Sequence, residues 1–288
     1  MSGRPRRNGG PGGQSDVAAE VLRASREGPP VALVTVIRAV RGAAAAVGAK
    51  LLLRPDGSRL GSLGGGALEE AVARDALEAL TARPRRAVGT AYYTPDGAPV
   101  ARREAGPDAV EVMIEVVEPP ATLLVVGAGH IGQALCAFGA RTGFSVAVLD
   151  DRKDFANRER LPEADAVLCG DIAEELRRFR IDGNTYVVLV SRGHKQDEVA
   201  LREVVGRGAA YVGMIGSKRR VGTVLRHLVE AGFDPAVLEA VRTPIGLDIG
   251  AETPEEIAIS ILAEVILARR GGSGRPMSEG RDAFRARR

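Results

Sequence analysis

The stretch Leu123–Gly132, LLVVGAGHIG, predicts the fold of the C-terminal half of this chain. It reads as an apolar strand followed by the pattern G-x-G-x-x-G, and an apolar helix continues through Phe138. In this pattern the first glycine permits a tight turn, the second lets a pyrophosphate approach the backbone, and the third lets the helix pack closely on the strand. The N–H groups at the start of the helix then face an anion. The stretch therefore predicts a Rossmann-like nucleotide-binding unit.

The next apolar stretch strengthens this prediction, because it ends in the acidic pair Asp150-Asp151. The pair follows the glycines by about the 20 residues at which dinucleotide-binding folds place a carboxylate for the ribose. Strand candidates alternate with longer helical segments, at 122–126, 145–149, 166–169, 186–190 and 211–215. Such alternation predicts an α/β fold with a parallel, doubly wound sheet. A Rossmann-like scaffold whose ligand is not a dinucleotide remains an alternative.

Polar loops follow the carboxyl ends of the first, fourth and fifth predicted strands, at 127–132, 191–197 and 214–220. In open α/β sheets, ligands bind outside these strand ends, where the strand order reverses. Each side chain alone would be read as a solvated surface group, but their shared position favours a site that grips phosphate and polar heterocycle edges. The predicted ligand-binding residues in this half are Gly127, Gly129, His130, Gly132, Asp150, Arg192, His194, Asp197, Ser217 and Lys218.

The N-terminal half follows a different pattern, in which the glycine-rich loop Gly61–Gly66 precedes a helix. Strands are expected at 31–37, 49–54, 87–93 and 110–117, and helices at 16–27 and 67–80. These elements predict a small α+β domain, which Pro119-Pro120 separate from the Rossmann-like domain. The predicted organisation is a disordered basic tail at 1–15, the α+β domain at 16–118, the Rossmann-like domain at 119–270 and a disordered tail at 271–288.

The start of the last helix is marked by Thr253-Pro254-Glu255-Glu256. The segment combines an N-cap threonine, a proline at the first helical position and a capping-box glutamate. We expect the helix to run to about Arg270.

The distribution of charge argues against a nucleic-acid-binding protein. The formal net charge of +3 comes from the tails, since residues 1–15 carry three arginines and no acid, and residues 271–288 carry five arginines against two acids. The body between them is therefore mildly acidic, which is the wrong sign for a surface that tracks phosphates. No apolar run approaches the roughly 20 residues of a membrane-spanning helix, and no secretory segment is visible. These features predict a cytoplasmic protein.

The two cysteines, Cys136 and Cys169, form neither a disulfide framework nor a zinc site, because they lack a CxxC pair and a His-rich partner segment. No metal site is predicted. Cys136 lies among apolar residues of a helix and Cys169 ends an apolar strand, so core packing is the favoured role of both. Cys169 keeps the alternative of facing the ligand cleft.

Several motifs, taken in order, resemble the xanthine dehydrogenase accessory protein (XdhC/CoxI) family. In the N-terminal half they lie at 48–50 (GAK), 56–57 (DG) and 61–69 (GSLGGGALE). In the C-terminal half they lie at 127–132 (GAGHIG), 191–194 (SRGH) with Asp197, 213–218 (GMIGSK) and 244–250 (PIGLDIG). The resemblance covers nearly all of 31–270, and motifs in order are far more specific than one glycine loop.

The resemblance implies a maturation chaperone without catalytic residues of its own. Such a protein binds the molybdenum cofactor (molybdopterin), protects it while a cysteine desulfurase supplies a terminal sulfur, and delivers it to a xanthine dehydrogenase-type molybdenum hydroxylase. Family members are commonly homodimers. The pterin and phosphate are expected at the sheet-edge loops or at the N-terminal loop, where the predicted contacts are Lys50, Gly64, Gly65 and Gly66.

One segment departs from the family pattern. Residues 41–47 read RGAAAAV, with Ala43 to Ala46 where similar proteins carry hydroxyl and guanidinium donors. Arg38 and Arg41 are the available substitutes.

Two other functions remain open at this point. The first is an NAD(P)-dependent oxidoreductase, based on Gly127–Gly132 and Asp150, with His194 as a base and Asp197 as the group that orients it. The second is a nucleotide-sensing regulatory subunit that binds a partner and catalyses nothing.

Overall fold

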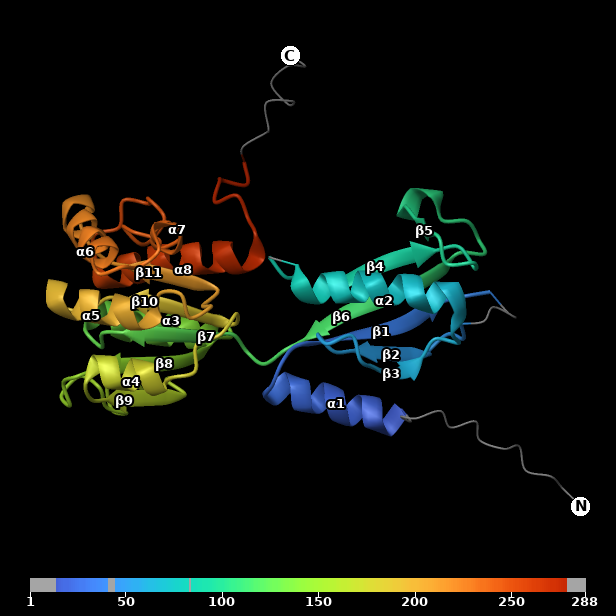
Figure 1. The fold of residues 1–288 in the computed structure, drawn as a ribbon, viewed down its shortest axis with the longest axis horizontal. Coiled ribbons are helices and arrows are strands. Elements are labelled where there is room, and N and C mark those ends of the chain that lie inside the picture. The colour runs from blue at the N-terminus through green and yellow to red at the C-terminus, as the bar shows by residue number, and fades with distance from the viewer. Residues whose placement is uncertain (1–13, 41–44, 83, 279–288) are drawn as a thin grey trace, which may run out of the picture. The chain divides into compact units, whose positions relative to one another are not determined.

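The computed structural model describes residues 14–40, 45–82 and 84–278 (Figure 1). The chain divides into two compact units, Met1–Pro119 and Pro120–Arg288. Most of the two predicted tails lies outside the described residues, as do Arg41 and the alanines at 43 and 44. The first helix nevertheless starts at Gln14, inside the segment that was predicted to be disordered, so that boundary was wrong.

The N-terminal unit is built on a six-stranded antiparallel sheet in the order β3-β2-β1-β6-β4-β5. The strands are β1 (Val31–Arg38), β2 (Lys50–Leu53), β3 (Arg59–Ser62), β4 (Val88–Tyr93), β5 (Pro99–Val100) and β6 (Val110–Val117). The helices are α1 (Gln14–Arg26), α2 (Gly66–Thr81) and a single 3-10 turn, Arg102–Glu104.

Side chains of this sheet alternate between its two faces, since successive residues of a strand point in opposite directions. On one face, Val112 of β6 and Leu53 of β2 join the apolar side of α2 in one cluster. On the other face, Val17 of α1 packs with Val31 and Leu52. The two helices therefore cover opposite faces of the sheet (Figure 1).

The C-terminal unit holds a parallel sheet of five strands in the order β11-β10-β7-β8-β9. The strands are β7 (Thr122–Val126), β8 (Ser145–Asp150), β9 (Ala166–Cys169), β10 (Thr185–Leu189) and β11 (Tyr211–Met214). The helices are α3 (His130–Arg141), α4 (Ile172–Arg178), α5 (His194–Val204), α6 (Lys218–Glu230), α7 (Pro235–Glu239) and α8 (Pro254–Arg270).

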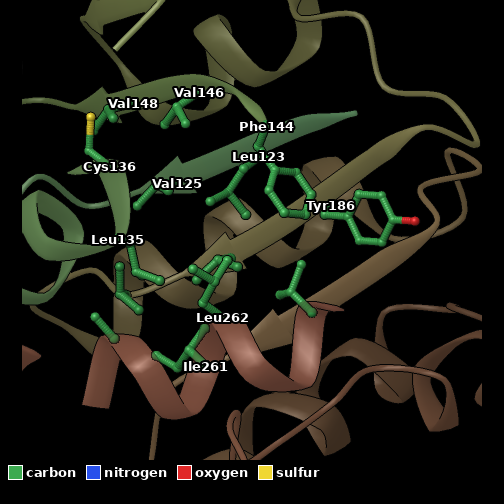
Figure 2. Close-up of a cluster of buried hydrophobic side chains, with 14 of the residues drawn as sticks. Leu123, Val125, Leu135, Cys136, Phe144, Val146, Val148, Tyr186, Ile261 and Leu262 are labelled. Carbon is green, nitrogen blue, oxygen red and sulfur yellow. The ribbon is translucent and has the colours of Figure 1, made fainter. Parts of the chain in front are cut away.

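Apolar residues cover both faces of this sheet, as expected for strands that run through the middle of a doubly wound fold. On one face Leu123 and Val125 pack against Leu135 of α3 and Ile261 of α8. Figure 2 shows these side chains pointing toward one another from the strand and the two helices. On the other face, strand residues pack against α4, α5, α6 and α7. The predicted fold class is therefore confirmed.

Element boundaries agree with the predictions within a few residues, and the segments 110–117, 122–126 and 166–169 agree at both ends. The predicted capping box is also present, because Thr253 Oγ1 accepts from the N–H of Glu256 and the Glu256 carboxylate accepts from the N–H of Thr253. The short strands β3 and β5 were not predicted. Within the described residues, no helix is long and apolar enough to cross a membrane.

Candidate functional site

The strand order brings two of the predicted loops together. The order reverses between β7 and its neighbour β10, and ligands of open α/β sheets bind at this switch point, outside the carboxyl ends of the strands. Gly127 directly follows β7. A Cβ atom on it would lie 2.7 Å from the carbonyl oxygen of Val190, which directly follows β10. The missing side chain therefore allows the two loops to touch.

The other two glycines of the pattern have different surroundings. A Cβ atom on Gly132 would lie 1.8 Å from the carbonyl oxygen of Gly127, so this glycine lets α3 start directly against the loop. A Cβ atom on Gly129 would meet no atom within 4 Å. The space beside Gly129 is therefore open, as the fingerprint requires where a phosphate approaches the backbone.

The first turn of α3 offers backbone donors beside that space. The N–H of Ala128 donates to a carboxylate oxygen of Asp150 at 2.7 Å. The N–H groups of Gly129, His130 and Ile131 have no acceptor within the described residues. The side chain of His130 is exposed. A helix N-terminus with unpaired N–H groups and the positive end of the helix dipole suits an anion.

Asp150, the predicted ribose ligand, already has several partners. The residue is only 3% exposed, and its two carboxylate oxygens accept from Ala128 N–H and from Nε and Nη2 of Arg152. Burial alone would raise the pKa of Asp150, but the hydrogen bonds from Arg152 and Ala128 outweigh it and lower the pKa to about 2. A ribose would have to compete with these donors, which weighs against a dinucleotide in its usual pose.

The loop after β10 is held by buried contacts. Asp197 is only 2% exposed, and its Oδ1 accepts from the hydroxyl of Ser191 at 2.5 Å. Gln196 Nε2 donates to Asp151 Oδ2 at 2.6 Å, which connects α5 to the end of β8. These bonds fix the loop that carries the exposed Arg192. In this structure Asp197 is thus a group that holds the loop in place.

Three further predicted residues lie at the starts of helices. His194 is the first residue of α5, Lys218 is the first residue of α6, and Ser217 directly precedes it. The side chains of His194 and Lys218 lie outside the described part of the chain. Since these helices follow the neighbouring strands β10 and β11, all three residues lie at the same edge of the sheet as Gly129.

Sequence reasoning missed two arginines at this edge. Arg152 and Arg160 surround the ring of Phe155 together with Arg192, with Cζ atoms 3.8, 4.8 and 5.8 Å from the ring centroid in the order Arg152, Arg160, Arg192. Arg152 directly follows the acidic pair Asp150-Asp151, so its position beside the predicted site could have been inferred from the sequence. Phe155 and Arg160 belong to the irregular segment between β8 and β9, which has no periodicity to interpret.

The N-terminal glycine loop differs because the carboxylate of Glu69 already accepts hydrogen bonds from its N–H groups. Oε2 of Glu69, on α2, accepts from the Ser62 hydroxyl at 2.6 Å and from the N–H groups of Leu63 and Gly65 at 2.7 and 3.0 Å. Burial would raise the pKa of Glu69, but these three donors together hold it below its ordinary value. The carboxylate occupies the position that an external anion would need.

Lys50 lies on the other face of the same sheet. Its Nζ donates to Thr35 Oγ1 at 2.8 Å, and it lines a cavity of about 480 Å³ with Leu33 and with Val17 and Val21 of α1. Gly64–Gly66 lead into α2, which covers the opposite face. The predicted contacts of the N-terminal half therefore do not form one site in this structure.

Among the described residues, no group of three or more His, Cys, Asp or Glu side chains could hold a metal ion. Cys136 is buried in the core (Figure 2), where burial raises the pKa of its thiol to about 11. Cys169 is exposed at the end of β9, beside Asp150 in the parallel ladder. The predicted core role is thus confirmed for Cys136 and wrong for Cys169.

Two protein-family models match the chain. The model of the XdhC and CoxI family matches residues 24–91, and the model of the XdhC Rossmann domain matches residues 123–265. The two matches lie in the N-terminal and the C-terminal unit, respectively.

Three curated relatives are similar to the chain. The uncharacterized protein YqeB of Escherichia coli is 31% identical over 261 residues, which cover 90% of this chain and 47% of the relative. A probable xanthine dehydrogenase subunit of Bacillus subtilis is 30% identical over 159 residues, covering 55% of this chain and 46% of the relative. The molybdenum cofactor insertion chaperone PaoD of Escherichia coli is 24% identical over 277 residues and is covered to 86%. The chain spans about half the length of the first two relatives.

Proposed function

Because this chain belongs to the XdhC and CoxI family of xanthine dehydrogenase accessory proteins, we propose that it binds the molybdenum cofactor and delivers it to a xanthine dehydrogenase-type molybdenum hydroxylase. The main support is that both family domains match in order along one chain. A relative named as a molybdenum cofactor insertion chaperone adds to it. In this role the chain has no catalytic residue of its own.

The cofactor site that we propose lies at the carboxyl edge of the parallel sheet. Molybdopterin carries a phosphate, and the open N–H groups of Gly129, His130 and Ile131 are suited to hold it. Lys218 and His194 begin the neighbouring helices at the same edge and would add charge-assisted hydrogen bonds. Since the described residues contain no metal-binding cluster, recognition would depend on phosphate and pterin contacts.

The remaining parts of the proposal concern partners. We expect a cysteine desulfurase to supply the terminal sulfur while the cofactor is bound, and we expect a cytoplasmic homodimer. The N-terminal residues Lys50, Gly64, Gly65 and Gly66 stay secondary candidates, because Glu69 already occupies the donors of their loop.

The decisive experiment is anaerobic purification followed by analysis for molybdenum and pterin, together with a fluorescence titration with nicotinamide cofactor. We expect molybdopterin to be recovered with the protein. If only nicotinamide cofactor binds and a hydride-transfer activity appears, the oxidoreductase alternative holds. If nucleotide binds without either pterin or activity, the protein is instead the nucleotide-sensing regulator.

Gly129→Val tests the place of the phosphate. The variant should fold, because the space beside Gly129 is open and its φ of −67° is accessible to any residue, but the side chain would fill the space needed for the ligand. Pterin recovery should fall strongly. Gly129→Ala is the matched control with a smaller side chain and should lose less. Unchanged recovery in folded Gly129→Val would place the phosphate elsewhere.

Lys218→Ala and His194→Ala test the neighbouring loops. A charged hydrogen bond to phosphate contributes about 1.5–3 kcal/mol, or roughly 10- to 150-fold in affinity. Each variant should reduce cofactor retention within that range. Wild-type retention by both would remove the loops after β10 and β11 from the site.

The double variant Cys136→Ala/Cys169→Ser tests whether a thiolate holds the metal. We expect it to retain the cofactor, since the high pKa of Cys136 keeps that thiol protonated and Cys169 is a single exposed side chain. Loss of molybdenum from the folded double variant, with pterin still bound, would show that metal–sulfur bonding contributes.

A further inference from the structure

Arg152, Arg160 and Arg192 gather around the ring of Phe155, and the proposed function gives this group of positive charges no role. Their Cζ atoms lie 3.8 to 5.8 Å from one ring centroid, so three guanidinium groups share a small volume. Gathering like charges costs free energy unless anions balance them. Stacking on the ring offsets part of this cost.

Among the described residues, carboxylates form ion pairs with only one of these three arginines. Arg152 pairs with Asp150 at 2.8 Å and approaches Asp151 at 3.9 Å. Within the described residues, neither Arg160 nor Arg192 has a carboxylate within salt-bridge distance. The Nε atom of Arg160 is also buried and has no hydrogen-bond partner. A desolvated cationic donor without an acceptor is unfavourable, so the protein itself compensates the charge of Arg160 poorly.

The group lies next to the open donors of α3. Gln133, in the first turns of that helix, donates from Nε2 to the carbonyl oxygen of Arg160 at 3.0 Å, and Arg160 Nη2 approaches Gln133 Oε1 at 3.4 Å. Arg192 comes from the loop after β10, on the other side of the switch point. The three arginines thus connect the segment after β8 with the loop after β10.

We propose that Arg152, Arg160 and Arg192 form a subsite for a phosphate monoester of the ligand, with Arg160 and Arg192 as the binding groups. Arg152 is a positioning residue, because Asp150 engages its Nε and Nη2 atoms. Planar guanidinium groups bind phosphate oxygens in a bidentate manner, which a lysine cannot reproduce. The inference rests on the proposed function in taking the ligand to carry a phosphate, and it adds the guanidinium groups to the open N–H groups of α3 as donors to that same phosphate. The phosphate belongs either to a phosphorylated pterin or to a phosphorylated nucleotide.

The subsite is tested on the full chain with simple probes. Binding of inorganic phosphate, and of NADP⁺ compared with NAD⁺, is measured by isothermal titration for wild type, Arg192→Gln and Arg160→Gln/Arg192→Gln. Arg192 is exposed, so the single variant should fold even where the double variant does not. Arg192→Lys keeps the charge but loses the planar fork. Arg180→Gln, which removes an exposed arginine that lies before β10 and pairs with Asp182, is the matched control.

We expect Arg192→Gln to weaken phosphate binding at least about tenfold, the double variant to weaken it further, and Arg192→Lys to restore it only in part. Arg180→Gln should bind as wild type does. If the arginine variants lose the preference for NADP⁺ over NAD⁺, the phosphate comes from a nucleotide. If they lose molybdopterin during purification instead, it comes from the pterin.

The inference is overturned if wild type binds inorganic phosphate no better than the folded arginine variants, or if Arg180→Gln weakens binding equally. These results are distinct from a failure of the proposed function. Wild-type protein without pterin, but with arginine-dependent phosphate binding, would refute the cofactor role and leave the subsite in place.

Discussion

The two glycine-rich loops of the chain, Gly61–Gly66 and Gly127–Gly132, look alike in sequence and differ in structure. In the first, Gly61, Gly64, Gly65 and Gly66 all have φ between 75° and 116°, which only glycine adopts readily. In the second, Gly127 alone has a positive φ, of 115°. The first loop needs glycine for its backbone conformation, whereas the second needs it mainly for space around the backbone.

The two loops also differ in what occupies their donors. Glu69 accepts from the amides of Leu63 and Gly65, so the first loop is satisfied by its own helix. Among the amides at the start of α3, Asp150 accepts only from that of Ala128, and those of Gly129, His130 and Ile131 have no acceptor within the described residues. A glycine-rich loop can therefore accept an external anion only where neighbouring carboxylates leave its N–H groups open.

The largest expected effect belongs to Gly132→Ala. Its methyl group would lie 1.8 Å from the carbonyl oxygen of Gly127, which requires α3 to move off the loop. We expect the free energy of unfolding to fall by about 3 kcal/mol or more, measured by urea denaturation. Gly129→Ala, in open space, should change it by less than about 0.5 kcal/mol. If Gly132→Ala were as stable as wild type, the close contact between α3 and the carbonyl oxygen of Gly127 would not require a glycine at this position.

The next effect comes from Asp150→Asn. The pKa of Asp150 is lowered to about 2 from an unfolded value near 3.9, so its contribution is complete above about pH 5 and is lost as the pH falls toward 2. We expect the variant to lose about 2–3 kcal/mol at pH 7 and to differ less from wild type as the pH falls through this window. Asp151→Asn is the control and should change little, because this side chain is 40% exposed and the amide oxygen of asparagine can still accept from Gln196 Nε2. If Asp150→Asn lost the same free energy of unfolding at every pH, the contribution of Asp150 would not come from its ionised carboxylate.

A smaller effect is expected for Gly65→Ala compared with Gly129→Ala. Neither new methyl group would meet an atom within 4 Å, so only the backbone differs, with φ of 77° at Gly65 and −67° at Gly129. With ψ of −168°, Gly65 lies in an extended positive-φ region that is almost exclusive to glycine, and forcing a residue with a Cβ into it costs about 1–3 kcal/mol. Gly65→Ala should therefore show a clearly lower unfolding midpoint than Gly129→Ala. Equal unfolding midpoints for the two variants would show that the positive φ at Gly65 does not require glycine.

The smallest effect is expected for Glu69→Gln, which removes the charge that caps the first loop. We expect a loss of about 1 kcal/mol at neutral pH. The pKa of Glu69 is lowered in the folded chain, so its contribution is present above the unfolded value and is lost as the pH falls through the folded value. Glu70→Gln, which breaks only an exposed pair with Arg59, serves as the control. If Glu69→Gln instead creates phosphate binding, the first loop is a masked anion site.

Much of the fold could be predicted from the sequence because its elements are strongly periodic or clearly capped. The segment Thr122–Val126 is continuously apolar, and Thr253 with Glu256 forms the expected capping box. The strand Arg59–Ser62 could not be found in this way, because none of its four residues is buried and two glycine turns flank it. Pairing with β2, rather than its own composition, makes it a strand.

The candidate site was predicted only in part. The glycine pattern correctly indicated where β7, α3 and the switch point lie, since the spacing of those glycines follows from local geometry. The role of Asp150 could not be read in the same way, because its partner Arg152 is set by how the chain turns after β8. Cys169 shows the same limit, since burial at the end of an apolar strand depends on what covers that edge.

By itself, the sequence determined the parallel α/β sheet of the C-terminal unit, the small α+β domain before it and the fingerprint at Gly127–Gly132, because hydrophobic periodicity and glycine spacing depend on residues that are close along the chain. Only the tertiary structure decided which amides stay open and which charges stay unpaired. Glu69 accepts from the amides of the first glycine loop, and Arg160 from the segment before β9 and Arg192 from the loop after β10 both lie against the ring of Phe155. Most of these contacts span only a few residues of irregular chain, and Arg192 reaches Phe155 from the loop after β10, so no helical or strand periodicity encodes them.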